Sequence, residues 1–128
     1  MQIYVNVLQT YMSALGMGDF ATIKALFTPD ARVNSPFLGE MPAEDFFEKL
    51  ADFTSESIIT PIDIFLSTTD RHQATAYFRY DWTLKDGTQI SFKVMDLFSF
   101  AANDDRVTRL DLIYDTHPIR SSVGNKFQ

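Results

Sequence analysis

The chain has 128 residues, of which 45% are hydrophobic and 14% aromatic, with two histidines and no cysteine. This length suits one hydrophobic core and is short for two, so we expect a single domain over residues 1–128. A formal net charge of -6 argues against a nucleic-acid partner, because phosphate binding requires clustered basic residues. The lack of cysteine argues against disulfides, thiol nucleophiles and the usual zinc sites, and we expect no metal and no cofactor.

No segment of the sequence is typical of a membrane-bound or secreted protein. The apolar runs fall short of the roughly 18 residues that indicate a membrane helix. The start of the chain, MQIYVNVLQT, lacks the basic residues and apolar stretch of a secretory signal. We therefore expect a cytoplasmic protein with no membrane partner.

The first half of the chain predicts three helices. Apolar residues recur with a helical period over residues 3–15, and glycines then end the run. A short second helix is expected after Asp19, which is a plausible N-cap residue. An extended segment over residues 31–36 separates it from a third helix over residues 42–53, which has acidic residues in its first turn.

The second half of the chain predicts strands. From residue 57 onwards, β-branched and aromatic residues dominate in four runs that suit long antiparallel strands. These runs cover residues 58–67, 73–84, 88–100 and 106–115. Because helices come first and strands follow without a linker between them, we expect an α+β fold with one shared core.

The dipeptide Asp86-Gly87 predicts a two-residue hairpin turn between the middle two strands. In that register Lys85 pairs with Thr88, and Asp81 would lie opposite Phe92. One face of the hairpin would then carry Tyr77, Arg79, Asp81, Thr83, Ile90, Phe92, Val94 and Asp96, and the other Phe78, Tyr80, Trp82, Leu84, Ser91, Lys93 and Met95. Because neither face is simply polar or apolar, we expect both to be covered, one of them by a pocket or a second subunit.

Three segments resemble the ketosteroid-isomerase-like superfamily, also called SnoaL-like or nuclear transport factor 2-like. They are Tyr11-x-x-Ala14-Leu15-x-x-Gly18-Asp19, Ala25-Leu26-Phe27-x-x-Asp30-Ala31-x-Val33-x-x-Pro36 and Val94-Met95-Asp96-x-Phe98. The resemblance implies a cystatin-like fold, with a cone-shaped, curved antiparallel sheet packed on the N-terminal helices around a pocket. It also implies an oxyanion hole formed by Tyr11 and Asp96. The family's general-base aspartate falls on Ser35, whose hydroxyl does not hold a proton taken from carbon near neutral pH, so we expect no steroid isomerisation.

A second resemblance, to limonene-epoxide-hydrolase-like members of the superfamily, rests on other residues. Arg79-x-Asp81 fits that group's arginine and first aspartate, Asp111 fits its second aspartate with a one-residue gap, and Asn34-Ser35-Pro36 resembles its Asn-x-Pro segment. This resemblance implies that the carboxylates and the arginine activate water. The ending Ile113-Tyr114-Asp115-Thr116-x-Pro118-x-Arg120 looks most like uncharacterised SnoaL-like proteins, for which the fold implies no particular chemistry.

The isomerase resemblance also orients the sheet. If Asp96 faces inward, Arg79, Asp81, Arg109 and Asp111 are expected to face inward with it. The aromatic residues Phe78, Tyr80 and Trp82 would then line the convex outer face, where related proteins dimerise, and we expect a homodimer through them.

Two functions remain open from the sequence. One is an acid–base isomerase, cyclase or hydrolase acting on a small apolar substrate, with hydration or epoxide opening favoured. The other is a non-catalytic ligand-binding or dimeric interaction domain, in which the same charges form a buried network. The expected partner is a small apolar or partly polar ligand. Candidate catalytic residues are Tyr11, Arg79, Asp81, Asp96 and Asp111, and candidate ligand contacts are Asn34, Ser35, Phe92, Val94, Phe98, Ile113 and His117.

Overall fold

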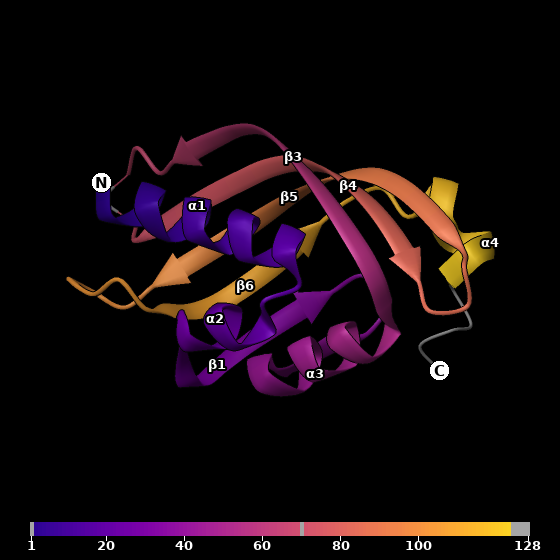
Figure 1. The fold of residues 1–128 in the computed structure, drawn as a ribbon. Helices are drawn as coiled ribbons and strands as arrows, with labels where there is room; N and C mark the ends of the chain where they lie inside the picture. Colours follow the sequence, from indigo (N-terminus) through magenta and orange to yellow (C-terminus); the bar gives the residue numbers. More distant parts are fainter. Residues whose placement is uncertain (1, 70, 124–128) are drawn as a thin grey trace.

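The computed structural model describes residues 2–69 and 71–123 (Figure 1). Its elements are, in chain order, α1 (Gln2–Met17), α2 (Phe20–Ala25), β1 (Phe27–Ser35), β2 (Gly39–Pro42), α3 (Ala43–Phe53), β3 (Thr54–Leu66), β4 (Gln73–Leu84), β5 (Gln89–Phe100), β6 (Val107–Ile113), η1 (His117–Ile119) and α4 (Arg120–Val123). The expected α+β class is confirmed. The first predicted long strand begins earlier than expected, at Thr54, directly after α3.

The turn between α1 and α2 fixes how the first helix lies on the sheet. Gly18 adopts a φ of +68°, and its N–H donates a hydrogen bond to the Leu15 carbonyl, while the Asp19 N–H donates to the Ala14 carbonyl. The predicted cap is confirmed, because the Asp19 carboxylate accepts hydrogen bonds from the Thr22 N–H at 3.1 Å and the Thr22 hydroxyl at 2.6 Å. The buried side of α1, which includes Tyr11, then packs against the sheet.

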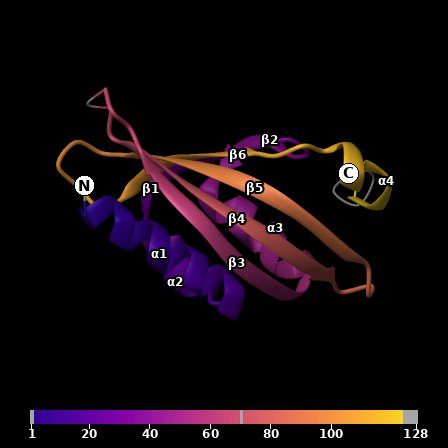
Figure 2. The same ribbon diagram turned by 90° about the horizontal axis from the view of Figure 1, so that it is seen from above.

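The strands form one curved six-stranded sheet in the order β2-β1-β6-β5-β4-β3. Neighbouring strands are antiparallel except for β1 and β6, which run parallel. Helices α1, α2 and α3 lie in front of the sheet in Figure 1 and cover its inner face. The short helix α4 lies at the same end of the sheet as the turn between β4 and β5, as Figure 2 also shows. The inner face is therefore enclosed by helices, while the outer face is left open.

The pairing of β4 with β5 differs from the predicted register by one residue. Residues 85–87 form a three-residue loop, closed by a hydrogen bond of 2.8 Å from the Leu84 N–H to the Thr88 carbonyl. The predicted two-residue turn requires a positive φ at both Asp86 and Gly87. In the structure Gly87 has a φ of +88°, whereas Asp86 does not have a positive φ. Tyr80 consequently pairs with Phe92.

This register reverses the predicted faces of β4 relative to β5, because neighbouring residues of a strand point to opposite sides. The inner face carries Phe78, Tyr80, Trp82 and Leu84 from β4 with Ile90, Phe92, Val94, Asp96 and Phe98 from β5. The predicted inward orientation of Arg79 and Asp81 is wrong, since both lie on the outer face. The predicted outward orientation of Phe78, Tyr80 and Trp82 is also wrong, because all three are buried.

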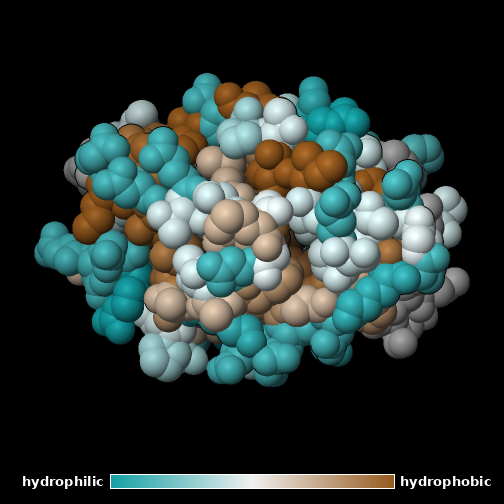
Figure 3. All heavy atoms as spheres, in the orientation of Figure 1, coloured by the Kyte–Doolittle hydropathy of each residue, from teal (hydrophilic) through white to brown (hydrophobic). Residues whose placement is uncertain are grey.

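The surface on the helical side carries no single dominant character. In Figure 3 the hydrophobic residues of this side lie in separate patches between hydrophilic ones. No helix in the described part of the chain combines the length and the apolar character that crossing a membrane requires.

Candidate ligand-binding cavity

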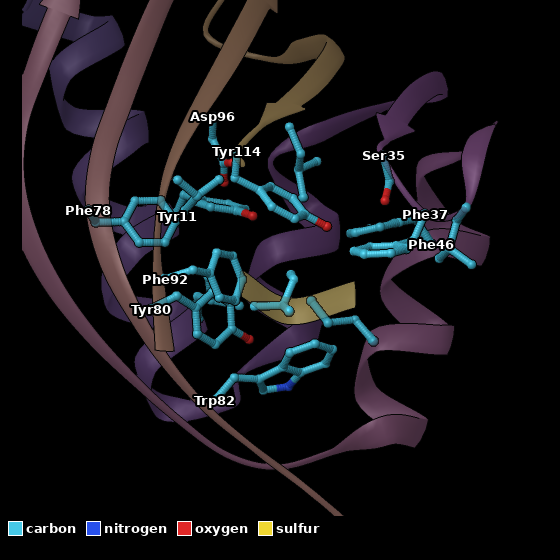
Figure 4. Close-up of a pocket in the computed structure, with 16 residues that line it drawn as sticks. Tyr11, Ser35, Phe37, Phe46, Phe78, Tyr80, Trp82, Phe92, Asp96 and Tyr114 are labelled. Carbon is cyan, nitrogen blue, oxygen red and sulfur yellow. The ribbon is translucent and has the colours of Figure 1, made fainter. Parts of the chain in front are cut away.

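A narrow cavity lies between the inner face of the sheet and the helices α1 and α3 (Figure 4). The centre of a water-sized sphere can move through about 50 Å³ of the cavity. This volume has room for several groups the size of a water molecule. The sheet and α1 contribute Tyr11, Leu15, Ser35, Phe78, Tyr80, Trp82, Phe92, Val94, Asp96 and Leu112, and the remaining walls are Phe37, Leu38, Phe46, Leu50, Tyr114 and Ile119. The lining is thus mostly aromatic and aliphatic, with few polar groups.

Aromatic rings form the long wall of the cavity. Phe92 stacks on Tyr80, with ring centroids 5.5 Å apart and ring planes at 18°. Phe92 also packs against Tyr114 at 4.9 Å, and Tyr114 packs against Phe37 at 6.4 Å. Flat rings on several sides favour a planar ligand, because such a ligand makes the largest contact with them.

Two of the aromatic residues turn their polar groups away from the cavity. The hydroxyl groups of Tyr80 and Ser57 share a buried hydrogen bond of 2.8 Å. The indole Nε1 of Trp82 donates to the Thr54 hydroxyl at 2.8 Å. Both partners lie on β3, so these bonds fix the two rings and leave their apolar surfaces to the cavity.

Asp96 is the chemically distinctive residue of the cavity. Its side chain is almost completely buried, and its Oδ1 atom has no hydrogen-bond partner among the described residues. Burial raises the pKa of Asp96 to about 8, while hydrogen bonding with Tyr11 acts in the opposite direction. At pH 7 the carboxyl group is therefore mostly protonated and able to donate a hydrogen bond.

Tyr11 reaches the same point from α1. Its ring packs edge-on against Phe98, with centroids 4.9 Å apart, which holds it in place beside Asp96. Burial, and next the negative charge of Asp96, raise the pKa of Tyr11 well above its usual value, so the hydroxyl stays neutral. In Figure 4 the side chains of Tyr11 and Asp96 lie together on one side of the cavity. Two neutral hydrogen-bond donors thus converge on one place.

A second polar pair, Ser35 and Tyr114, lies at another part of the wall. Ser35 is the buried last residue of β1, and Tyr114 follows the end of β6. Burial raises the pKa of Tyr114 to about 12, and hydrogen bonding with Ser35 acts in the opposite direction. Figure 4 shows Ser35 across the cavity from Asp96.

The structure brings five of the predicted site residues to the cavity: Tyr11, Ser35, Phe92, Val94 and Asp96. Phe98 lies beneath them in the core.

The remaining six predicted site residues lie elsewhere: Asn34, Arg79, Asp81, Asp111, Ile113 and His117. The ring of His117 is exposed, and its Nδ1 lies 3.2 Å from a guanidinium nitrogen of Arg120. Ile119, two residues later, lines the cavity instead.

The charged residues predicted to share the site form ion pairs on the outer face instead. Asp81 accepts hydrogen bonds from the Ser91 hydroxyl at 2.6 Å and from Arg79 at 3.2 Å. Arg109 forms ion pairs with Asp111 at 3.1 Å and with Glu40 at 2.7 Å. The expected inward orientation of Arg79, Asp81, Arg109 and Asp111 is wrong, and these side chains do not meet Asp96.

Sequence reasoning missed Tyr114 and the cavity roles of Tyr80 and Trp82. Leu110, Leu112 and Tyr114 alternate along the last strand and the residue after it, and all three point inward. This alternation could have predicted that Tyr114 faces the cavity. Phe37, Leu38 and Ile119 lie in a turn and a short helix, where no periodic pattern reveals the direction of a side chain. Within the described residues, no group of three or more histidine, aspartate or glutamate side chains is arranged to hold a metal ion.

Comparison with known proteins adds the family. The family model described as "SnoaL-like domain" matches residues 8–110. No curated protein matches the sequence.

Several solved structures share the fold. A putative SnoaL-like polyketide cyclase from Jannaschia sp. CCS1 is 12% identical, with a TM-score of 0.77 over 97% of this chain and 93% of its own. TerC, co-crystallised with polyporic acid, is 14% identical, with a TM-score of 0.76 over 93% of this chain and 96% of its own. A protein with a ketosteroid isomerase-like fold from Catenulispora acidiphila DSM 44928, in complex with trimethylamine, is 12% identical, with a TM-score of 0.74 over 92% of each chain. The expected fold is confirmed.

Proposed function

The chain belongs to the SnoaL-like domain family, and we propose that its cavity binds a small, flat, largely apolar molecule by an oxygen atom that accepts hydrogen bonds. The observation that carries this proposal is the buried Asp96 carboxyl group, whose Oδ1 lacks a partner within the described structure, in an otherwise apolar cavity. Buried polar atoms are nearly always hydrogen-bonded, so an unpaired one in a cavity calls for a partner that the chain itself does not supply, and a ligand oxygen that replaces water there would fill that position.

The donor pair determines which ligand oxygen fits. A protonated Asp96 and a neutral Tyr11 both donate, so they suit an acceptor such as a carbonyl oxygen. They stabilise an enolate oxygen still more strongly, because hydrogen bonds to a charged acceptor are stronger than those to a neutral one. Two of the fold neighbours are in keeping with such ligands, since one is described as a putative SnoaL-like polyketide cyclase and TerC was co-crystallised with polyporic acid.

Recognition of the ligand is the function that this geometry supports best. Asp96 is the one carboxylate among the described lining residues, and none of them is a histidine, so the cavity has no separate base to take a proton from carbon. Catalysis is the second candidate, favoured by the donor pair itself. In such a reaction water would take the C–H proton of a sufficiently acidic substrate, and Tyr11 and Asp96 would stabilise the enolate that forms.

An NMR titration with 4-ethylacetophenone tests the proposal, because its carbonyl group accepts hydrogen bonds and donates none. We expect Tyr11→Phe and Asp96→Leu to weaken binding by about two- to tenfold each, the effect of one lost hydrogen bond. Asp96→Asn keeps an N–H donor and should retain binding, and Asp81→Asn, the same substitution on the outer face, should have no effect. Equal affinity in all four variants would contradict the proposal.

The affinity should also depend on pH. Above pH 8 the Asp96 carboxyl group loses its proton and no longer donates to a carbonyl oxygen. We therefore expect the affinity of the wild-type protein for 4-ethylacetophenone to fall as pH rises through about 8, whereas the affinity of Asp96→Asn should stay constant.

For the quaternary state, we propose a homodimer through the outer face of the sheet, on different residues from those expected. Tyr77 pairs with Met95 and Met95 with Ile113 across β4, β5 and β6, and they form one apolar row on this open face. Met95 and Ile113 are 38% and 54% exposed, and Phe65 on β3 is 48% exposed. A second copy of the chain would remove this row from water, and aromatic and methionine side chains are typical of interface cores.

A further inference from the structure

We infer that Ser35 and Tyr114 form a second polar contact, which selects ligands carrying a hydroxyl or carbonyl group at the end opposite the oxygen held by Asp96. This inference rests on the proposed binding of a carbonyl ligand by Tyr11 and Asp96, and it extends that proposal from one end of the ligand to both.

The position of the pair follows from the parallel pairing of β1 and β6. Asn34 pairs with Asp111, and Ser35 and Leu112, the residues after them, both line the cavity. Tyr114 is the next residue after Leu112 on the same inward side. Figure 4 shows Ser35 across the cavity from Asp96, while the Tyr114 side chain starts beside Asp96 and extends its hydroxyl end toward Ser35.

The Tyr114 hydroxyl is held in a defined position. Its ring is packed between Phe92, at 4.9 Å, and Phe37, at 6.4 Å. Rotation of the ring away from the cavity would break both contacts, so the hydroxyl stays directed toward the space beside Ser35. A fixed polar group of this kind gives selectivity, because its position does not adapt to a ligand that lacks the matching group.

The chemistry of the pair differs from that of Tyr11 and Asp96. A serine hydroxyl both donates and accepts, and the Tyr114 phenol is neutral and does the same. Ser35 and Tyr114 therefore match a ligand hydroxyl as well as a carbonyl group. Besides the hydrogen bond between them, each hydroxyl can make a further one, and a purely apolar ligand end would remove water from that position without replacing its hydrogen bond, which costs binding free energy.

Two acetophenones of equal size separate the second contact from the first. They are 4-ethylacetophenone and 4-(hydroxymethyl)acetophenone, which differ only in a terminal methyl or hydroxyl group. We expect Ser35→Ala and Tyr114→Phe each to shift the ratio of the two dissociation constants by about two- to tenfold toward the ethyl compound, the effect of one hydrogen bond. Asn34→Ala, on the exposed side of β1, should leave the ratio as in the wild-type protein. Both compounds are titrated into every variant by NMR, and thermal unfolding shows which variants are folded.

The outcomes distinguish this inference from the proposed function. If Tyr11→Phe weakens both compounds but Ser35→Ala and Tyr114→Phe leave their ratio unchanged, the second contact is overturned and the first stands. If Ser35→Ala does not fold, Tyr114→Phe decides the question, because it keeps the ring and its packing. Absence of binding by both compounds would overturn both proposals.

Discussion

Tyr80 lies directly opposite Phe92 in the β4–β5 ladder, and their rings stack with centroids 5.5 Å apart. The predicted two-residue turn would have placed Phe92 opposite Asp81 instead. In the observed register the two rings lie on the inner face and form part of the long wall of the cavity. Asp81 and Arg79 lie on the outer face. One residue in the length of a turn therefore decides which side chains form the site.

Gly87 should be sensitive to substitution for this reason. Its φ of +88° lies in a region that residues with a Cβ rarely adopt, although no atom would obstruct a Cβ there. We expect Gly87→Ala to lower the free energy of unfolding by about 1 kcal/mol, measured by urea denaturation, and Gly87→Asn by less, because asparagine tolerates positive φ better. Thr88→Ala, next to the loop, provides a comparison. Equal stability of Gly87→Ala and the wild-type protein would contradict the importance of this conformation.

The elements of the fold were predictable because their signals are local. The helical period of α1, the Asp19 cap and the β-branched runs each depend on residues close in sequence. The placement of Tyr11, Ser35 and Asp96 in the cavity agreed with the alignment of three short motifs.

The faces of the sheet were not predictable in the same way. Asp86-Gly87 is compatible with loops of two or three residues, and the choice depends on whether Asp86 adopts a positive φ. The predicted register gave two mixed faces, whereas the observed one places Asp96 as the single charged residue on a buried, otherwise apolar face of β4 and β5. A requirement for clean alternation would have favoured the correct register.

The corrected faces change the test for dimerisation. Ile113→Asp places a charge in the middle of the exposed apolar row, and we expect it to convert a dimer to a monomer in light scattering. Ile3→Asp, the same substitution at an exposed position on α1, should remain dimeric. Trp82→Asp should destabilise the fold rather than the dimer, because Trp82 is buried in the cavity wall. A wild-type monomer at micromolar concentration would contradict the proposed interface.

Ser35 provides a test of the comparison with ketosteroid isomerases. The wild-type protein should not isomerise 3-cyclohexenone to the conjugated ketone, because the lining residues that the structure describes include no base besides Asp96. Ser35→Asp adds a carboxylate across the cavity from Tyr11 and Asp96, so we expect detectable isomerisation, followed by ultraviolet absorbance. Asn34→Asp adds the same group on the outer side of β1 and should stay inactive. Activity of the wild-type protein equal to that of Ser35→Asp would show that another group acts as the base.

The stability of the protein should decrease as pH rises from about 4 to about 8, through the titration of Asp96. In the unfolded chain an aspartate has a pKa of about 3.9, whereas burial raises the pKa of Asp96 to about 8 in the folded protein. Between these values the folded state binds the proton and the unfolded state does not, so each increase in pH favours unfolding. The loss contributed by this one group is on the order of 5 kcal/mol, since a tenfold change in proton affinity corresponds to about 1.4 kcal/mol.

Asp96→Asn isolates this contribution, because asparagine has nearly the same shape and does not titrate. We expect the difference in unfolding free energy between the variant and the wild-type protein, measured with urea, to grow in favour of the variant from pH 5 to pH 8. Above pH 8 the difference should level off, because Asp96 is then ionised in both the folded and the unfolded states. Asp81→Asn, on the outer face, should show a constant difference across this range, because the Ser91 and Arg79 side chains lower the pKa of Asp81 and the group is therefore ionised in both the folded and the unfolded states above about pH 5. If the profiles of Asp96→Asn and the wild-type protein run parallel across this range, Asp96 is already ionised in the folded protein at pH 5, and Tyr11 is then the one neutral donor left to hold a carbonyl oxygen.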